Sequence, residues 1–235
     1  MEIHGRREVV RRRVLVPTWV AKTVMSLTGL VMAAFVVVHM LGNLKVLVDP
    51  EGMDAYAAWL REAFEPVLPR EGLLWIFRIA LAVCLVLHVA FALVLWRRGR
   101  ATRTRGASRL APRGVSARWM LPTGVLLLLF VVVHILDLTV GRWVEAPGFR
   151  HPDPSFHAAA NVAASLGRPL MAAFYLLVLL ALTLHLAHGI QLAWQDLGGS
   201  GPRGRAVAKV VAHAVAIVVL VGDGAVVIAA WTGVL

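Results

Sequence analysis

The sequence has a single cysteine, Cys84, among 235 residues. Because a disulfide needs two cysteines, none can form within the chain, and a metal cluster held by several cysteines is excluded. Cys84 lies inside an apolar run, where we expect a small buried side chain. Charged residues are also scarce, at 16% of the chain against 59% hydrophobic residues, and the mean hydropathy is +0.76. This composition is too apolar for a soluble domain.

Acidic residues are few, 13 against 24 basic ones, which gives a net charge of +11. The basic residues lie beside apolar runs, so they indicate orientation in a membrane rather than nucleic-acid binding. Strands are not predicted, because the runs are too long and lack alternation. We expect no cleavable signal peptide, since the first apolar run is too long and lacks a small-residue cleavage site close behind it.

The chain contains five apolar runs of membrane length. The expected spans are residues 19–46, 73–96, 119–140, 169–195 and 206–232. They predict an all-α membrane protein with five transmembrane helices in one bundle, forming a single domain over residues 1–235. Within the loop 47–71, the segment MDAYAAWLREAF at 53–64 has apolar residues at helical spacing, which predicts a short amphipathic helix on the membrane surface. Residues 142–168 are predicted to be a loop.

Arginine-rich segments alternate with mixed or acidic loops along the chain. They are the amino-terminal arm, the 97–118 loop and the 198–209 loop. With five alternating helices, all three fall on one side of the membrane. Because positive loops face the cytoplasm, we expect a cytoplasmic amino terminus and a carboxyl terminus outside.

Every span carries at least one histidine, and a histidine in hydrocarbon is costly without a partner. His39 lies 17 residues beyond Lys22, and His134 lies 16 residues beyond Arg118. At a rise of about 1.5 Å per residue, both histidines lie roughly 25 Å from the cytoplasmic edge. They form an outer level.

A second pair of histidines lies closer to the cytoplasmic edge. His88 stands nine residues before Arg97, and His185 stands 11 residues before Asp196. Both therefore lie roughly 15 Å from that edge. The four histidines thus form two levels, and each level takes its two members from different helices.

Two imidazoles at one depth, from two helices, are what bis-histidine haem ligation in a bundle requires. The alternatives for each histidine alone are a hydrogen-bonded structural residue or a proton relay. Zinc or copper is a further alternative, although no carboxylate or thiolate clusters with the histidines. His188 and His213 are expected to bond a ligand histidine or a haem propionate. His4, His151 and His157 lie outside the spans and are expected to be solvated.

Three segments resemble one family, the dihaem cytochrome b subunits of succinate dehydrogenases and fumarate reductases. HMLGNL at 39–44 looks like its first-helix motif. HLAHGIQLAWQDLG at 185–198 is similar to its fourth-helix ligand motif, in which the haem histidine stands four residues before a glycine, here Gly189. His185 rather than His188 therefore takes the ligand role. WIFRIALAVCLVLHV at 75–89 matches the second helix, whereas His134 in the third span stands in a less specific context.

The resemblance covers nearly the whole chain, and it implies two haem b groups. His39 with His134 would hold the haem far from the iron–sulfur subunit, and His88 with His185 the near one. The chain would anchor a flavoprotein and an iron–sulfur protein on the cytoplasmic face of a bacterial cell membrane. It would carry electrons between them and a quinone, with menaquinone favoured, as part of respiratory complex II and the tricarboxylic acid cycle. The dicarboxylate chemistry would lie on the flavoprotein, and the complex could form a higher oligomer.

Polar residues near the outer haem level are the candidates for a quinone or proton site. They are Asn43, Lys45, Glu62, Glu65 and Asp137, each with an interfacial structural role as the alternative. Arg78 is a candidate partner of an outer-haem propionate. Ser26 fits an inner quinone site or a bond to its own helix, of which the second is favoured. Asp223 is expected to face the bundle, because it is expensive against lipid.

Two other classes compete with this interpretation. One is the cytochrome b subunit of another quinone-linked oxidoreductase, of the nitrate reductase or hydrogenase type. The other is a non-redox transporter or structural membrane protein. HMLGNL and HLAHG, with one ligand per helix, favour the succinate dehydrogenase class over the first, and a haem spectrum would separate it from the second.

Overall fold

The computed structural model describes residues 16–104, 115–152 and 155–235, and its elements are helices. In order they are α1 (Thr18–Asn43), α2 (Lys45–Val48), α3 (Pro50–Glu62), α4 (Gly72–Thr104), α5 (Val115–His134), the π-helix η1 (Ile135–Val140), α6 (Ala158–Leu166), α7 (Pro169–Asp196) and α8 (Pro202–Trp231). The expected all-helical fold is confirmed.

Five helical segments are long and apolar enough to cross a membrane. They are Thr18–Val48, Gly72–Ala101, Arg118–Val140, Pro169–Asp196 and Pro202–Trp231. Each corresponds to one predicted span. The largest difference in bounds is in α4, which continues past residue 96 to Thr104. His4 and most of the amino-terminal arm lie outside the described residues.

Local sequence sets several helix ends. Pro169 and Pro202 occupy the first turns of α7 and α8, where a missing N–H costs nothing. Asp49 caps α3 by accepting a hydrogen bond from the Gly52 N–H at 2.8 Å. Gly141 ends η1 with φ of 62°, and a Cβ there would lie 2.2 Å from Cε1 of Phe149, so a larger residue does not fit.

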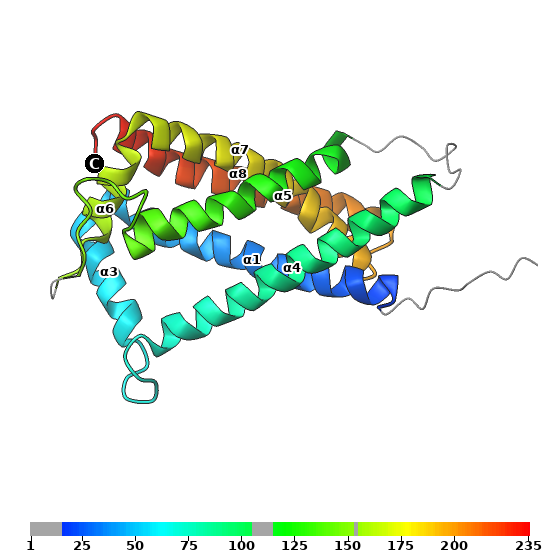
Figure 1. Ribbon diagram of the computed structural model, residues 1–235, viewed down its shortest axis with the longest axis horizontal. Coiled ribbons are helices and arrows are strands. Elements are labelled where there is room, and N and C mark those ends of the chain that lie inside the picture. Colours follow the sequence, from blue (N-terminus) through cyan, green and yellow to red (C-terminus); the bar gives the residue numbers. More distant parts are fainter. Residues whose placement is uncertain (1–15, 105–114, 153–154) are drawn as a thin grey trace, which may run out of the picture.

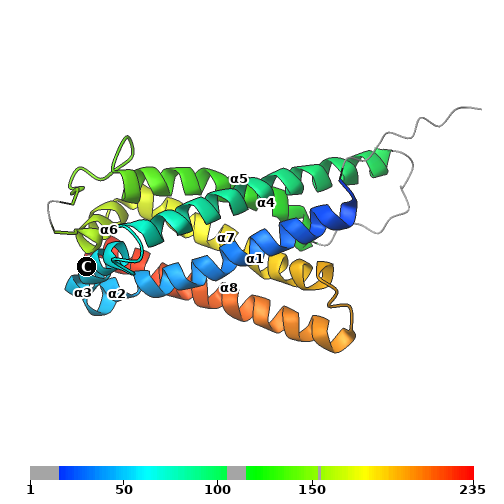
Figure 2. The same cartoon turned by 90° about the horizontal axis from the view of Figure 1, so that it is seen from below.

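The long helices alternate in direction, so their connections gather at two ends (Figures 1 and 2). The start of α1, the end of α4 and the α7–α8 turn share one end, and α3, α6 and the carboxyl terminus share the other. At the first end Lys22 Nζ lies 2.8 Å from Asp196 Oδ1, and Arg98 donates to the Val16 carbonyl at 2.7 Å. We call this the basic end, because it joins the segments where arginine is concentrated.

Helix α7 is the centre of the bundle, packed against α1, α5, α6 and α8. Small side chains let these helices approach closely. Ala212 and Ala216 of α8 are completely buried, and a Cβ on Gly222 would lie 2.5 Å from the sulfur of Met40 on α1. One buried cluster lies between α1, α7 and α8, and a second lies at the other end of α7 and α8, where α2, α3 and α6 cover them.

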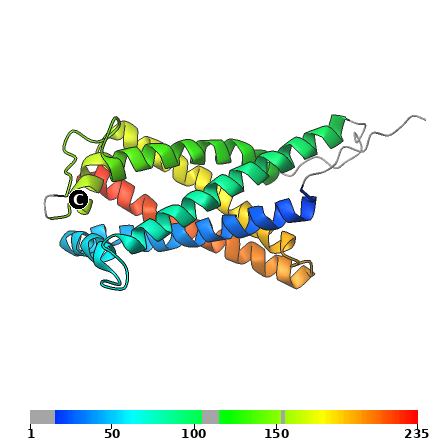
Figure 3. The same ribbon diagram turned by 60° about the horizontal axis from the view of Figure 1, so that its bottom comes forward.

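Helix α4 is packed differently. It runs along α1 and touches α3, whereas α5 and α7 are not among its closely packed neighbours in the part of the chain that the structure describes. Between Gly72 and Ala101 no residue of α4 is buried. Figure 3 shows α4 crossing the bundle at a steep angle to the helices behind it.

One short helix was not predicted, and another was. The segment 142–168, predicted to be a loop, contains α6, which buries Ala159 and Leu166 and packs against α3, α7 and α8. Its nine residues are too few, and its alanines too weakly apolar, to give a periodic signal. The predicted surface helix is present as α3, beginning at Pro50. His151 is exposed as expected, whereas His157, immediately before α6, is half-buried.

Candidate functional site

Two histidines approach each other at the end of the bundle away from the basic end, and we call them the outer pair. The ring centroids of His39 on α1 and His134 on α5 lie 5.7 Å apart, with their planes at 87°. Phe35 stacks on His39 at 5.4 Å, and Phe130 lies 5.3 Å from His134. Aromatic rings one turn away thus flank both imidazoles.

The other two histidines form an inner pair, closer to the basic end. The ring centroids of His88 on α4 and His185 on α7 lie 6.3 Å apart, with their planes at 60°. Both imidazoles are half-buried. The structure therefore brings together the same rings that the depth comparison placed at the same level.

The hydrogen bonds of the inner pair fix which ring nitrogen carries the proton. Nδ1 of His88 lies 3.0 Å from the Met25 carbonyl, which only accepts, so His88 donates through Nδ1. Nδ1 of His185 lies 3.1 Å from Oγ1 of Thr123. That hydroxyl gives its own proton to the Trp119 carbonyl at 2.6 Å, so it accepts from His185. In both rings Nε2 keeps its lone pair.

The outer histidine on α5 has a corresponding partner. Nδ1 of His134 lies 3.2 Å from the hydroxyl oxygen of Tyr175. Tyr175 in turn donates to Oδ2 of Asp137 at 3.3 Å, so its oxygen is left to accept from His134. Three of the four imidazoles thus place the proton on Nδ1, which leaves Nε2 as the nitrogen that can bind a metal.

Asp137 lies at the centre of a buried polar network and has no exposed side-chain surface. Its Oδ1 accepts from Nη2 of Arg168 at 2.8 Å, and its Oδ2 accepts from Ser165 and Tyr175. Arg168 also donates to the Val144 carbonyl at 2.9 Å. The network therefore ties η1, α6 and α7 together beside His134.

Two glycines make room for the inner pair. A Cβ on Gly29 of α1 would lie 3.0 Å from Cε1 of His88, and one on Gly124 of α5 would lie 3.4 Å from Cε1 of His185. The first distance is tighter than almost any real Cβ contact allows. The backbones of α1 and α5 can pass these imidazoles closely because the helices have glycine there.

The donor set fits a haem at each pair. Two imidazoles that bind one metal from opposite sides, each through a bond of about 2 Å, have ring centroids roughly 6 Å apart. The observed separations are 5.7 and 6.3 Å. Neither α1 with α5 nor α4 with α7 is a closely packed helix pair within the described ranges. The helices of each pair are thus joined mainly through other helices, which is compatible with a macrocycle between them.

The remaining predicted haem-site residues lie around these pairs. Arg78 bonds Glu71 at 3.3 Å and covers the Trp75 ring at 4.9 Å, so a carboxylate in the turn just before α4 already pairs with its charge. His188 is half-buried one turn beyond His185. His213 is exposed, and its Nδ1 donates to the Lys209 carbonyl of its own helix at 2.7 Å.

The predicted quinone candidates separate into three environments. Asn43 donates to Asp223 Oδ1 at 3.0 Å across α1 and α8, which confirms that Asp223 faces the bundle. Asp137 is enclosed in the network described above. Lys45 is exposed with its Nζ 5.5 Å from the Tyr56 ring. Glu65 is exposed in the turn that follows α3.

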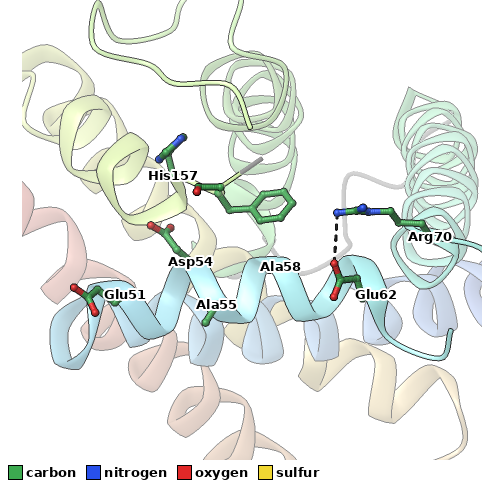
Figure 4. Close-up of a pocket in the computed structure, with 9 residues that line it drawn as sticks. Glu51, Asp54, Ala55, Ala58, Glu62, Arg70 and His157 are labelled. Atoms are coloured by element: carbon green, nitrogen blue, oxygen red, sulfur yellow. Dashed lines mark ion pairs between the residues drawn. The ribbon is translucent and has the colours of Figure 1, made fainter. Parts of the chain in front are cut away.

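Glu62 lies away from the histidine pairs, on an open groove between α3 and the segment before α6. The groove is lined by Glu51, Asp54, Ala55, Ala58, Glu62, Arg70, Ser155, Phe156 and His157 (Figure 4). There Glu62 pairs with Arg70 at 3.5 Å, and both side chains are more than half exposed. The groove is open, and three carboxylates and an arginine line it, which does not suit an apolar quinone ring.

The residues that hold the imidazoles were not identified from the sequence. Thr123, Tyr175, Ser165 and Arg168 contact the histidines or Asp137 from other helices, at separations of up to 62 residues. The one available signal was a polar group inside or beside an apolar run. No spacing links such a group to a particular histidine.

Comparison of the chain with family models, with curated proteins and with solved structures finds no match.

Proposed function

We propose that this chain is the dihaem cytochrome b anchor of a succinate:quinone oxidoreductase. It would carry electrons between an iron–sulfur subunit and a membrane quinone, with menaquinone favoured. The observation that carries the proposal is the presence of two imidazole pairs, with ring centroids 5.7 and 6.3 Å apart. In three of the four rings Nδ1 is hydrogen-bonded to another residue, which leaves Nε2 for a metal. The resemblance of HMLGNL and HLAHG to the family's ligand motifs supports the specific class.

Bound haems would supply one-electron carriers at two depths in the membrane. The chain's own residues bind and orient them. His39 and His134 would offer Nε2 at the outer site, and His88 and His185 at the inner one. Met25, Thr123 and Tyr175 hold three of these rings through Nδ1, which prevents rotation away from the metal.

The charge distribution supports the direction of assembly. The basic end is expected to face the cytoplasm, which brings the inner pair nearer to a docked iron–sulfur protein. Among the predicted quinone candidates, Asn43 is favoured, because it lies one turn beyond His39. Its partner Asp223 adds a carboxylate that could accept a proton from a quinol.

The first test is a count of haem. The purified chain, or the complex isolated through it, should give the b-type bands of a reduced-minus-oxidised spectrum. A pyridine haemochrome assay should give two haems per chain. A preparation with no b-type bands would leave only the non-redox class of membrane protein.

A histidine series tests the ligand assignment, and the chain offers a matched control on the same helix. His185→Ala should remove one haem and retain the other, because it deletes one ligand of the inner pair. His188→Ala, one turn away, should retain both. If His185→Ala keeps two intact haems while His188→Ala loses one, then His188 is the ligand and the assignment to His185 is wrong.

The succinate dehydrogenase class is tested through its partners. A flavoprotein with covalently bound flavin should co-purify with the chain, together with an iron–sulfur protein. Co-purification with a molybdenum or nickel–iron subunit instead would assign the chain to the nitrate reductase or hydrogenase class.

A further inference from the structure

The three imidazoles with assigned partners differ in the acceptor that each one meets. His88 donates to a backbone carbonyl, and His185 donates to a threonine hydroxyl. Both acceptors are neutral groups, a peptide carbonyl and a hydroxyl. His134 instead donates to Tyr175, whose own proton is directed to the carboxylate of Asp137. The outer pair is therefore the one that is connected to a buried charge.

The donors and acceptors along the chain from His134 through Tyr175 to Asp137 set the direction of its hydrogen bonds. Asp137 accepts from Arg168, Ser165 and Tyr175, and its Oδ1 forms an ion pair with the guanidinium of Arg168 at 2.8 Å. A phenol that donates to a carboxylate becomes a stronger acceptor, because chained hydrogen bonds polarise one another. The Nδ1–H of His134 thus meets a stronger acceptor than the hydroxyl of a tyrosine in isolation.

A stronger acceptor on Nδ1 makes Nε2 a stronger electron donor to a metal. Electron donation stabilises the oxidised form of an iron centre relative to the reduced form. The reduction potential at that site is then lower than it would be with the Nδ1–H unpaired or weakly paired.

We propose that Tyr175 is a positioning residue of the outer site, which joins His134 to Asp137 and thereby lowers the reduction potential of the haem that His134 would bind. The inference rests on the proposed function and adds to it the device by which the two haems acquire different potentials.

The local fold supports a dedicated arrangement. His134 is the last residue of α5, and the chain then continues as the π-helix η1, a rare form that is frequent at functional sites. This turn carries Asp137 inward to Tyr175. Arg168 and Ser165, at the α6–α7 junction, hold the carboxylate from the other side. The two carboxylate oxygens of Asp137, on η1, are thus contacted from α6, from α7 and from the junction between them.

The test is a redox titration of the haem bands in the complex carrying Tyr175→Phe. Tyr56→Phe is the matched control, because Tyr56 is the other of the chain's two tyrosines and lies on α3. His88→Ala, which retains only the outer pair, assigns the outer component of the titration. In Tyr175→Phe the outer component should move to higher potential, the inner one should stay in place, and Tyr56→Phe should leave both unchanged.

A second variant, Asp137→Asn, keeps the tyrosine and removes the charge behind it. It should move the outer component in the same direction. Two bound haems with an unchanged outer potential in both variants would overturn the inference and leave the proposed function standing. A shift of both components together would also overturn it, because that result indicates a general change in the bundle. Absence of haem from the unmodified chain would overturn the proposed function itself.

Discussion

Asp137 and Asp223 both lie inside helices long and apolar enough to cross a membrane, and their surroundings differ. Asp137 has no exposed side-chain surface and pairs with Arg168 at 2.8 Å, with two further hydroxyl partners. Asp223 is half-buried and is bonded by the neutral amide of Asn43. The sequence showed both carboxylates in apolar runs, but it did not show that one has a cation as partner and the other an amide.

This contrast predicts unequal costs of removal. Asp137→Ala should lower the free energy of unfolding by about 3–5 kcal/mol, because it breaks an ion pair whose carboxylate is fully buried. Asp223→Ala should cost about 0.5–1.5 kcal/mol, the value of one hydrogen bond. Chemical unfolding of both variants in the same detergent measures the difference. Equal losses would show that the Asp137 network contributes no more than a single bond.

At the scale of helices, the spans were predictable and the short elements were not. Twenty or more apolar residues give an unambiguous signal, so all five long helices were located from the sequence. The nine residues of α6 and the six of η1 are too short for a period to be read. Their positions are decided by contacts with α3, α7 and Tyr175, which only the folded chain brings together.

Helix α1 passes close to His88 at Gly29, and this contact gives a prediction about how helices pack at the inner pair. Gly29→Ala places a Cβ 3.0 Å from the imidazole, so it should displace the ring and reduce haem occupancy at the inner site. Gly224→Ala is the matched control, since a Cβ there has no heavy atom of another residue within 4 Å. Both substitutions raise helix propensity equally, by about 1 kcal/mol.

The spectrum distinguishes the two glycine variants. Pyridine haemochrome assay and the reduced-minus-oxidised bands should show less inner haem in Gly29→Ala and full content in Gly224→Ala. Full occupancy in both would mean that α1 can move away from His88 without cost.

For the molecule as a whole, the two ends of the bundle differ in charge, and basic residues are concentrated at one of them. Two contacts align the ends of α1, α4 and α7 at the basic end. Lys22 pairs with Asp196, and Arg98 donates to the Val16 carbonyl. The depths of His39 and His185 were counted from Lys22 and Asp196. The ion pair between these two residues, at 2.8 Å, shows that they lie at one level. Residue counts along each helix therefore paired the same rings that the structure brings together. The hydrogen-bond partners of Nδ1 depend on helix rotation and packing, which residue counts do not give.

Membrane orientation can be measured with single cysteines. In a Cys84→Ser background, Ser200→Cys lies in the α7–α8 turn at the basic end, and Val67→Cys lies beyond α3 at the other end; both positions are exposed. A membrane-impermeant thiol reagent added to intact cells should label Val67→Cys and not Ser200→Cys. The reverse pattern would place the basic end outside and contradict the expected topology.

The sparse packing of α4 has a consequence for how the protein is made. A helix that packs on α1 and touches α3, with no buried residue between Gly72 and Ala101, gains little from docking onto the rest of the bundle. Under the proposed function, a haem held by His88 and His185 would join α4 to α7, so haem loading would also be the step that fixes α4 in the bundle.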